Sequence, residues 1–246
     1  MVKCMLTQIW RQKYYALYKD MAGRHTQARF NFILRKKLTP RDIADMFNDF
    51  AEDYEQVYFN IGWRPYEVVG DFMAKIIPEE NRSKLKVLDV GAGTGLLGNK
   101  LKNHGFTHVD GLDPAKNMLN VAKRRNIYQR YICAFINKDR NNAIETDYYD
   151  YIVASGAFNE GLIPCGAFQE MIRIVKPGGR ITFTVPTKYI NISDNLRDQL
   201  LPLIDQLAQE GVWEVTSVAL EDGELSSTDG PGTLFSLKVF VSEKTF

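Results

Sequence analysis

The sequence predicts an α/β protein in which helices cover both faces of a mostly parallel sheet. From residue 86 onward, short apolar segments alternate with longer segments whose apolar residues have helical spacing. This alternation is typical of parallel strands joined by helical crossovers. The last two apolar segments, 213–220 and 233–241, are separated only by a linker rich in Gly, Ser and Asp. They predict a terminal hairpin and therefore a mixed sheet.

The length and composition are compatible with one such domain. The chain has 246 residues, of which 45% are hydrophobic and 25% charged, average values for globular proteins. No segment approaches the roughly 18 consecutive apolar residues that cross a bilayer, so we expect no membrane span. Cys4, Cys133 and Cys165 lack the spacing of a disulfide framework or a zinc site, which favours an intracellular protein without a bound metal.

A basic N-terminal extension precedes the domain. Residues 1–38 contain nine Lys or Arg and one acid, a net charge of +8, which leaves −7 for residues 39–246. A body with that charge is not a natural nucleic-acid surface, so we expect no nucleic-acid partner. The extension is either a solvated, partly disordered segment or a mitochondrial targeting segment. We therefore expect a cytoplasmic protein, with mitochondria as the alternative.

Two helices are expected at the start of the domain. Thr39 has the character of an N-cap and Pro40 that of a first-turn residue, and this helix is expected to run to about Tyr54. A second helix is predicted over residues 65–77. We expect residues 39–80 to form a helical preface that acts as a lid.

The remaining residues, 81–246, are expected to form the sheet and its helices. Candidate strands lie at 86–90, 109–112, 131–136, 149–155, 180–185, 213–220 and 233–241. Candidate helices lie between them, near 95–104, 115–125, 164–175 and 193–210.

A glycine-rich turn joins the first strand to the next helix, in the segment Val87-Leu88-Asp89-Val90-Gly91-Ala92-Gly93-Thr94-Gly95. Glycines let a ligand lie against bare backbone, and exposed amides at the helix start can donate to it. Gly93, Gly95 and Gly98 also match the dinucleotide fingerprint, so a nicotinamide cofactor is an alternative.

Asp89 separates these two kinds of cofactor. It lies two residues before the first glycine, at a strand end that is expected to face the ligand crevice. A carboxylate there repels the pyrophosphate of a dinucleotide, whereas it favours the ammonium and sulfonium groups of S-adenosylmethionine. The residues therefore favour S-adenosylmethionine as the cofactor.

A second acid, Asp113, ends the following strand, roughly twenty residues after the glycines, where a carboxylate can accept hydrogen bonds from both hydroxyls of a ribose. Pro114 and Met118 follow as expected apolar walls for the adenine. Ordinary helix packing is the alternative for Met118.

These segments, with Gly111-Leu112-Asp113-Pro114-Ala115-Lys116-Asn117-Met118-Leu119 and Lys176-Pro177-Gly178-Gly179, resemble the ordered motifs of class I S-adenosylmethionine-dependent methyltransferases. More narrowly, residues 39–220 resemble the Williams-Beuren region methyltransferase-like family, through Phe47-Asn48-Asp49-Phe50-Ala51-Glu52-Asp53-Tyr54-Glu55, Tyr128-Gln129-Arg130, Pro164-Cys165 and Gly211-Val212-Trp213-Glu214. The resemblance implies a Rossmann-like, seven-stranded sheet with a reversed C-terminal β-hairpin.

The resemblance also implies a set of site residues. The cofactor is expected to lie on the glycine turn, beside the end of the second strand and the segment after the fourth, which gives Asp89, Gly91, Ala92, Gly93, Gly95, Asp113, Pro114, Met118 and Ser155. By the same analogy, Tyr54, Trp63 and Arg64 close over the methionine end, with Arg64 facing its carboxylate. Many relatives have an acid after the third strand for the adenine amino group, whereas this chain has Cys133-Ala134-Phe135-Ile136-Asn137, and no residue is assigned to that role.

No catalytic residue is assigned. Transfer of a methyl group from a sulfonium chiefly requires alignment of the acceptor and exclusion of water. The segment after the fourth strand lacks the Pro-Pro-aromatic arrangement associated with amino groups of nucleobases. Glu160, the nearest carboxylate, is interpreted as a solvated loop acid, and Cys165 as part of a helix start.

The aromatic-rich preface suits a small-molecule or lipid-like acceptor better than a polymer. Two other functions stay open at this point. One is a module that binds S-adenosylmethionine without catalysis and acts through a protein partner; the other, less favoured, is a nicotinamide-dependent oxidoreductase.

The choice of cofactor gives the first testable prediction. S-Adenosylmethionine and S-adenosylhomocysteine are expected to raise the melting temperature, whereas NAD and NADP leave it unchanged, because Asp89 lies beside the glycine turn. At about 100 dissociation constants of ligand the stabilisation is about 2.7 kcal/mol, which differential scanning fluorimetry detects. A shift with NAD alone would contradict the assignment.

Overall fold

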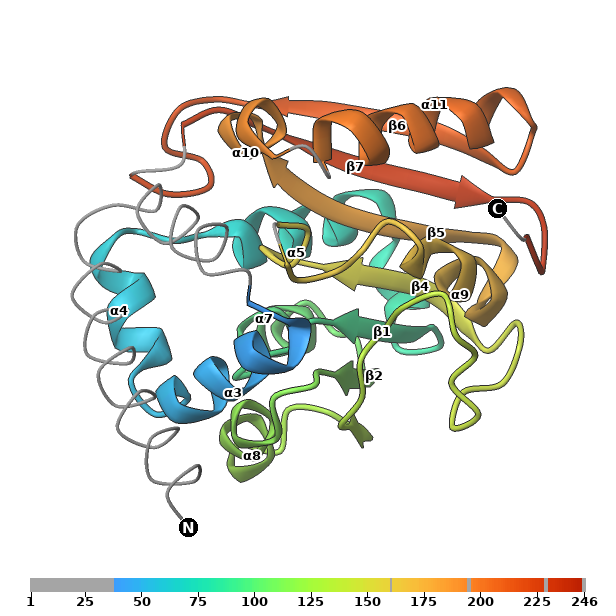
Figure 1. Ribbon diagram of the computed structural model, residues 1–246. Coiled ribbons are helices and arrows are strands. Elements are labelled where there is room, and N and C mark those ends of the chain that lie inside the picture. The colour runs from blue at the N-terminus through green and yellow to red at the C-terminus, as the bar shows by residue number, and fades with distance from the viewer. Residues whose placement is uncertain (1–37, 160, 194–195, 228–229, 245–246) are drawn as a thin grey trace, which may run out of the picture.

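Seven strands form one sheet in the part of the chain that the structure describes. The structure is a computed structural model and describes residues 38–159, 161–193, 196–227 and 230–244. Across the sheet the strands are ordered β3-β2-β1-β4-β5-β7-β6 (Figure 1). Their bounds are β1 Lys86–Val90, β2 His108–Leu112, β3 Tyr131–Ile132, β4 Tyr149–Ala154, β5 Val175–Pro186, β6 Trp213–Leu220 and β7 Gly232–Val239.

The pairing of the last strands makes the sheet mixed. Strands β1 to β5 pair in parallel, while β7 lies antiparallel between β5 and β6. The pairing of β7 with β5 runs from Arg180 opposite Lys238 to Pro186 opposite Gly232. The predicted α/β fold with its reversed C-terminal hairpin is therefore confirmed.

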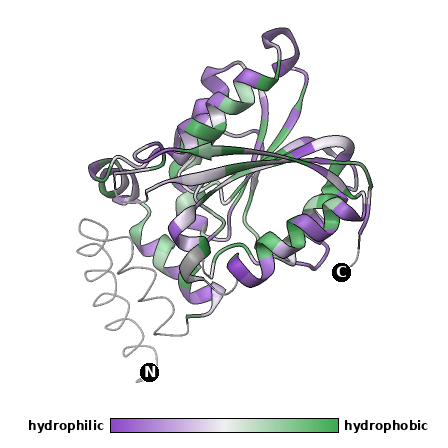
Figure 2. Cartoon of the chain, turned by 90° about the horizontal axis from the view of Figure 1, so that it is seen from above, coloured by the Kyte–Doolittle hydropathy of each residue, from purple (hydrophilic) through white to green (hydrophobic). Residues whose placement is uncertain are grey.

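Helices lie on both sides of this sheet (Figure 2). On one face, Phe168 of α9 and Leu207 of α11 are fully buried against β4, β5 and β7. On the other, Met73 of α5 and Leu101 of α7 are fully buried against β1 and β2. The helices are α3 Pro40–Phe50, α4 Tyr54–Asn60, α5 Pro65–Ile76, α6 Glu79–Arg82, α7 Leu96–Asn103, α8 Lys116–Arg124, α9 Ala167–Ile174, α10 Thr187–Ile192 and α11 Leu201–Gln209, with a π-helical turn, η1, at Leu196–Leu200.

Strand β1 separates the two cores. Leu88 and Val90 are buried in the core that α9 covers, and Val87 is buried in the core that α5 and α7 cover. Because side chains alternate along a strand, Asp89 points to the same face as Val87. This orientation decides where the carboxylate of Asp89 lies.

The helical preface differs from the single helix expected over residues 39–54. It divides into α3 and α4, joined by a turn at 51–53. The bend lets the aromatic rings meet, since the ring centroids of Tyr54 lie 5.7 Å from Phe50 and 4.3 Å from Tyr58. The capping box predicted at Thr39 is present.

Two further elements are shorter than predicted. The strand expected over 131–136 is confined to β3, Tyr131–Ile132, because its partner β2 ends at Leu112 and offers no further pairing. The helix expected over 193–210 is replaced by α10, η1 and α11. Pro202 lies in the first turn of α11, where a proline lacks the amide that a continuous helix needs.

The linker between β6 and β7 contacts the segment that joins α4 to α5. The amide of Arg64 donates to the carbonyl of Leu225 over 2.6 Å. The hydroxyl and the amide of Ser227 donate to the carbonyl of Ile61 over 2.7 and 3.1 Å. The C-terminal hairpin therefore fixes the end of the preface.

The described residues contain neither a helix that could span a membrane nor a cluster of side chains that could bind a metal ion. None of their helices combines the length and apolar character needed to cross a membrane. Within the same ranges, His, Cys, Asp and Glu side chains do not gather in groups of three or more that could hold a metal ion. Nearly all of the basic extension, residues 1–37, lies outside the described residues.

Replacing Phe168 tests the core on the α9 face. Its ring is fully buried, with centroids 5.3 Å from Phe158 and 5.4 Å from Trp213. Phe168→Ala is expected to lower the free energy of unfolding by about 3–5 kcal/mol, because burial is lost and a cavity remains. Phe59→Ala is the matched control, since Phe59 is 47% exposed and its loss is expected to cost about 0.5 kcal/mol or less. Urea unfolding measures both; equal losses would contradict the prediction.

Candidate functional site

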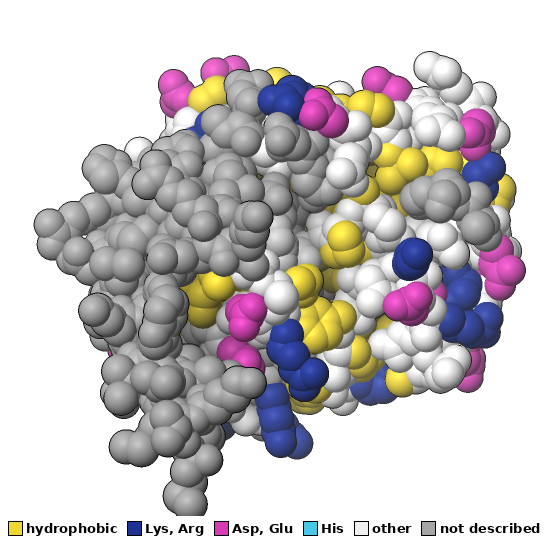
Figure 3. Space-filling view, viewed as in Figure 1, with side chains coloured by type: hydrophobic (Ala, Val, Ile, Leu, Met, Phe, Trp, Pro, Cys, Tyr) yellow, Lys and Arg dark blue, Asp and Glu magenta, His cyan; other side chains and the backbone are white. Residues whose placement is uncertain are grey.

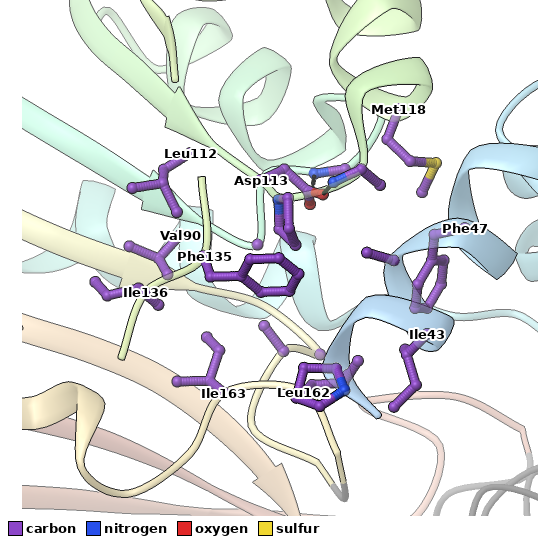
Figure 4. Close-up of a pocket in the computed structure, with 18 of the residues that line it drawn as sticks. Ile43, Phe47, Val90, Leu112, Asp113, Met118, Phe135, Ile136, Leu162 and Ile163 are labelled. Atoms are coloured by element: carbon purple, nitrogen blue, oxygen red, sulfur yellow. Dashed lines mark hydrogen bonds between the residues drawn. The ribbon is translucent and has the colours of Figure 1, made fainter. Parts of the chain in front are cut away.

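A cavity lies beyond the carboxyl ends of β1, β2 and β4 (Figure 4), the edge at which parallel sheets commonly bind ligands. Its empty space, counting the part open to solvent, is about 740 Å³. The lining comes from three strand ends, α3, α4, α8 and two loops. It comprises Pro40, Ile43, Ala44, Phe47, Tyr54, Val90, Gly91, Gly93, Leu112, Asp113, Pro114, Ala115, Met118, Phe135, Ile136, Ser155, Gly156, Ala157, Gly161, Leu162 and Ile163.

The structure brings part of the predicted site to this cavity. Among the predicted residues, those that line it are Tyr54, Gly91, Gly93, Asp113, Pro114, Met118 and Ser155. Those that do not line it are Trp63, Arg64, Asp89, Ala92 and Gly95. Glu160 lies outside the described residues.

The glycine turn presents its backbone to the cavity in left-handed conformations that glycine adopts without strain. Gly91 and Gly93 have φ of +72° and +53°, a region that side chains disfavour, and a side-chain carbon on Gly91 would lie 2.7 Å from Ala157. The amides of Gly91 and Ala92 donate to the carbonyl of Leu112 over 2.9 and 3.1 Å. The amides of Gly91 and Ala92 therefore hold the turn against the end of β2.

Asp113 is buried, and its carboxylate links the turn after β1 to the start of α8 after β2. Its Oδ2 accepts from the amide of Gly93 over 2.9 Å, and its Oδ1 accepts from the amide of Ala115 over 2.7 Å. Burial raises the pKa of Asp113 to about 6, while the hydrogen bonds from Ala115 and Gly93 oppose the rise. A carboxylate has about four acceptor positions, so each oxygen retains capacity for a further donor.

Asp89 does not face the cavity, contrary to the sequence interpretation. Strand alternation directs its side chain beneath the glycine turn, toward α7, rather than into the crevice that Val90 lines. It is 1% exposed and accepts a hydrogen bond from the hydroxyl of Tyr128 over 2.6 Å. Any influence of its charge on a ligand therefore acts through the turn.

Trp63 and Arg64 also lie away from the cavity. Trp63 packs behind Tyr54 and over Gly156, where a larger residue would overlap the indole ring. The Arg64 side chain is 58% exposed and pairs with Glu67 over 2.7 Å. The hydrogen bond of its backbone to Leu225 keeps the residue at the hairpin linker.

The preface helices form a cover over the cavity. Asn48 of α3 accepts from the amide of Asn117 over 2.8 Å, and Arg124 of α8 pairs with Glu52 over 2.7 Å. On the inner side, Phe47 and Tyr54 pack against Ala115, Met118 and Val121. The helices predicted to act as a lid therefore lie over the cavity and contact α8. That they move when a ligand binds stays a prediction.

Sequence reasoning missed the apolar half of the lining. Ile43, Ala44 and Phe47 share one face of α3 by their spacing, a signal that was present in the predicted helix. Phe135 belongs to the segment after the third strand, which the sequence interpretation considered for the adenine without assigning a residue. The loop residue Leu162 had no such signal, because its segment lacks periodicity.

The sequence matches the methyltransferase domain family over residues 81–221, more than half of the chain. The chain belongs to the class I S-adenosylmethionine-dependent methyltransferases. S-Adenosylmethionine is the cofactor of this family, as the sequence interpretation predicted.

Two curated relatives illustrate the range of the family. Human methyltransferase-like protein 27 is 30% identical over 168 residues, which cover 68% of this chain and 66% of that protein. Demethylmenaquinone methyltransferase of Paenarthrobacter aurescens is 33% identical over 149 residues, which cover 58% of this chain and 54% of that protein. The chain thus spans between about half and just under two thirds of the length of these relatives.

Two solved structures share the fold at low identity. Magnesium protoporphyrin IX methyltransferase of Synechocystis, solved with bound S-adenosylhomocysteine, aligns with a TM-score of 0.59 at 14% identity, covering 82% of this chain and 99% of that one. A putative methyltransferase of Haloferax volcanii, in complex with the Trm112 activator, aligns with a TM-score of 0.60, at the same identity and coverage.

The residues at the cavity fit this cofactor. Gly91 and Gly93 present bare backbone, and Asp113 is the single carboxylate among the described lining residues. The hydroxyl of Thr94, in the same turn, is buried and has no hydrogen-bond partner in the described part of the chain. Asp113 would hold the ribose, while Pro114 and Met118, which both line the cavity, would flank the adenine.

Asp113 gives the prediction for this site. Asp113→Ala is expected to weaken S-adenosylhomocysteine binding by about 2–4 kcal/mol, or about 30- to 1000-fold, because charged hydrogen bonds to the ribose are lost. Asp205→Ala, at an exposed position of α11, is the control and is expected to leave affinity unchanged. Calorimetry measures the affinities, and circular dichroism checks the fold. An unchanged affinity in folded Asp113→Ala would remove Asp113 from the site.

Proposed function

We propose that this protein transfers a methyl group from S-adenosylmethionine to a small, predominantly apolar acceptor. The supporting observation is the lining of the cavity on the side away from Asp113. There α3 and the loop after β4 contribute Ile43, Phe47, Leu162 and Ile163 (Figure 4). Asp113 and Tyr54 are the ionisable side chains among the described lining residues, so this wall suits an uncharged surface.

The chain's own residues would act by alignment and exclusion of water. Bound S-adenosylmethionine supplies an activated methyl group on its sulfonium. Ser155, Gly156 and Ala157 follow β4 and line the cavity between the glycine turn and the apolar wall. The cover of Phe47 and Tyr54 shields this region from solvent, which favours a displacement between partners held in line.

Relatives support an apolar acceptor without identifying it. The matched relatives include a demethylmenaquinone methyltransferase and a ubiquinone biosynthesis O-methyltransferase, named for acceptors with hydrophobic character. They also include a malonyl-[acyl-carrier protein] O-methyltransferase, so the relatives differ in acceptor. The apolar wall of the cavity in this chain favours an acceptor with hydrophobic character.

The acceptor class can be tested with donor labelled in its methyl group. Label is expected in lipid-soluble small molecules after incubation with cell extract, and not in fractions of RNA, DNA or protein. A control with heat-denatured enzyme measures background. Label confined to protein or nucleic acid would contradict the proposal, whereas donor binding without any labelled product would support a non-catalytic module.

Leu162 tests the apolar wall directly. Leu162→Asp places a charge on it and is expected to lower turnover of the identified acceptor by about tenfold or more, because about 1.4 kcal/mol of lost acceptor binding has that effect. S-Adenosylhomocysteine affinity is expected to stay within about threefold. Leu162→Met keeps the wall apolar and serves as the matched control. Unchanged turnover in Leu162→Asp would place the acceptor elsewhere.

A further inference from the structure

Tyr128 fills a slot that two glycines leave open. A side-chain carbon added to Gly111 of β2 would lie 2.6 Å from the ring of Tyr128, and one added to Gly98 of α7 would overlap the same ring. Tyr128 is 6% exposed, and Tyr131 packs edge-on against it with ring centroids 5.6 Å apart. Gly98, which completes the apparent dinucleotide fingerprint, therefore makes room for a tyrosine.

The hydroxyl of Tyr128 reaches a carboxylate that has no cationic partner. It donates to Oδ2 of Asp89 over 2.6 Å. The ion pairs formed within the described ranges do not include Asp89, and the other ionisable side chain that acts on it is Asp113, from the connection between β2 and α8. The hydroxyl of neighbouring Tyr131 instead accepts from the backbone amide of Tyr128 over 3.1 Å.

These surroundings place the titration of Asp89 near neutral pH. Burial raises the pKa of Asp89 to about 7. The hydrogen bonds from Tyr128 and, to a smaller extent, from the backbone of Gly98 lower the pKa, because they stabilise the charged carboxylate, and the negative charge of Asp113 raises it. The Tyr128 hydroxyl is therefore the side-chain group that keeps Asp89 charged.

We propose that Tyr128 is a positioning residue for the methyl donor, which holds the charged carboxylate of Asp89 beneath the glycine turn. This role rests on the proposed function. S-Adenosylmethionine has a sulfonium charge that S-adenosylhomocysteine lacks, so a negative charge behind the turn favours the first ligand over the second. The change of the affinity ratio around pH 7 therefore reports the charge of Asp89, because Asp113 titrates lower, with a pKa of about 6. Titration of the amino group that both ligands share affects both affinities and largely cancels in the ratio.

Calorimetry with both ligands, from about pH 6 to about pH 9, tests this role in the full chain. In the parent protein the ratio is expected to rise with pH, with a midpoint near 7. In Tyr128→Phe the ring still fills its slot, but the midpoint is expected about one pH unit higher, because a hydrogen bond to a charged group is lost. The part of the preference for S-adenosylmethionine over S-adenosylhomocysteine that comes from the charge of Asp89 then falls about fivefold at neutral pH, because fewer molecules carry that charge. It returns at alkaline pH, where Asp89 is charged again.

Two variants serve as controls for this experiment. Tyr131→Phe removes a neighbouring hydroxyl that does not touch Asp89, and its midpoint is expected to equal that of the parent protein. Asp89→Asn removes the group that titrates near pH 7, and the rise of the ratio with a midpoint near 7 is expected to disappear.

The protein without ligand gives an independent measurement. Asp89 and Asp113 have folded pKa values of about 7 and about 6, above the ordinary value of 3.8. Folding therefore favours the protonated form of both groups. Their contribution to the free energy of unfolding is fully present below about pH 4 and is lost as the pH rises through 6 and 7. In Tyr128→Phe the fall in the free energy of unfolding is expected to continue to higher pH. In Asp89→Asn the part of this fall that Asp89 causes is expected to disappear.

The outcomes separate this role from simple packing and from failure of the proposed function. If Tyr128→Phe weakens both ligands equally and leaves the pH midpoints unchanged, Tyr128 only fills space and the inference is wrong. A pH-independent ratio in the parent protein would overturn it as well. If neither ligand binds the parent protein at any pH, the proposed function fails instead, and the unfolding curves still test the pair of Tyr128 and Asp89.

Discussion

The hydrogen bond from the amide of Gly93 to the carboxylate of Asp113 fixes the glycine turn to the end of β2. The second oxygen of that carboxylate binds Ala115 at the start of α8, so one side chain links the connections that follow two neighbouring strands. Parallel pairing of β1 with β2 brings these connections to one edge of the sheet. The cavity, the packing of α8 and the cover that rests on α8 all follow from this link.

The same region holds two buried carboxylates without a paired cation. Asp113 is bound by backbone amides and Asp89 by a tyrosine hydroxyl, and the ion pairs of the described residues involve neither. Buried negative charge that lacks a cation lowers the stability of the folded chain. A ligand that brings positive charge relieves this cost, so the electrostatic arrangement that destabilises the protein without ligand favours a sulfonium-containing cofactor.

The cover over the cavity has two surfaces with different roles. Its outer contacts are polar, such as the ion pairs of Glu52 with Arg124 and Glu55 with Arg125, and exposed pairs of this kind contribute about 1 kcal/mol or less each. Its inner surface is apolar, formed by Ile43 and Phe47. The outer contacts orient the helices on α8, and under the proposed function the inner side chains select the surface of the acceptor. Figure 3 shows apolar side chains scattered among charged ones on the face of the molecule that is seen in Figure 1.

Local patterns in the sequence predicted the seven strands, the reversed hairpin, the glycine turn and Asp113, because periodicity and turn chemistry are local properties. They did not predict the division of residues 39–54 and 193–210 into separate helices. Seven of the predicted site residues, including Ser155 and Met118, line the cavity, since strand ends in a parallel sheet share one edge. Only the tertiary structure decided the position of Asp89, whose side chain follows Val87 to the face of α7, and the partnership with Tyr128, which lies 39 residues away. The tertiary structure also showed that Arg64 lies at the surface rather than at the cavity, and that Phe135 and Leu162 line the cavity. The physical reason is that strand orientation, glycine slots and loop paths depend on contacts between distant segments, which local patterns do not encode.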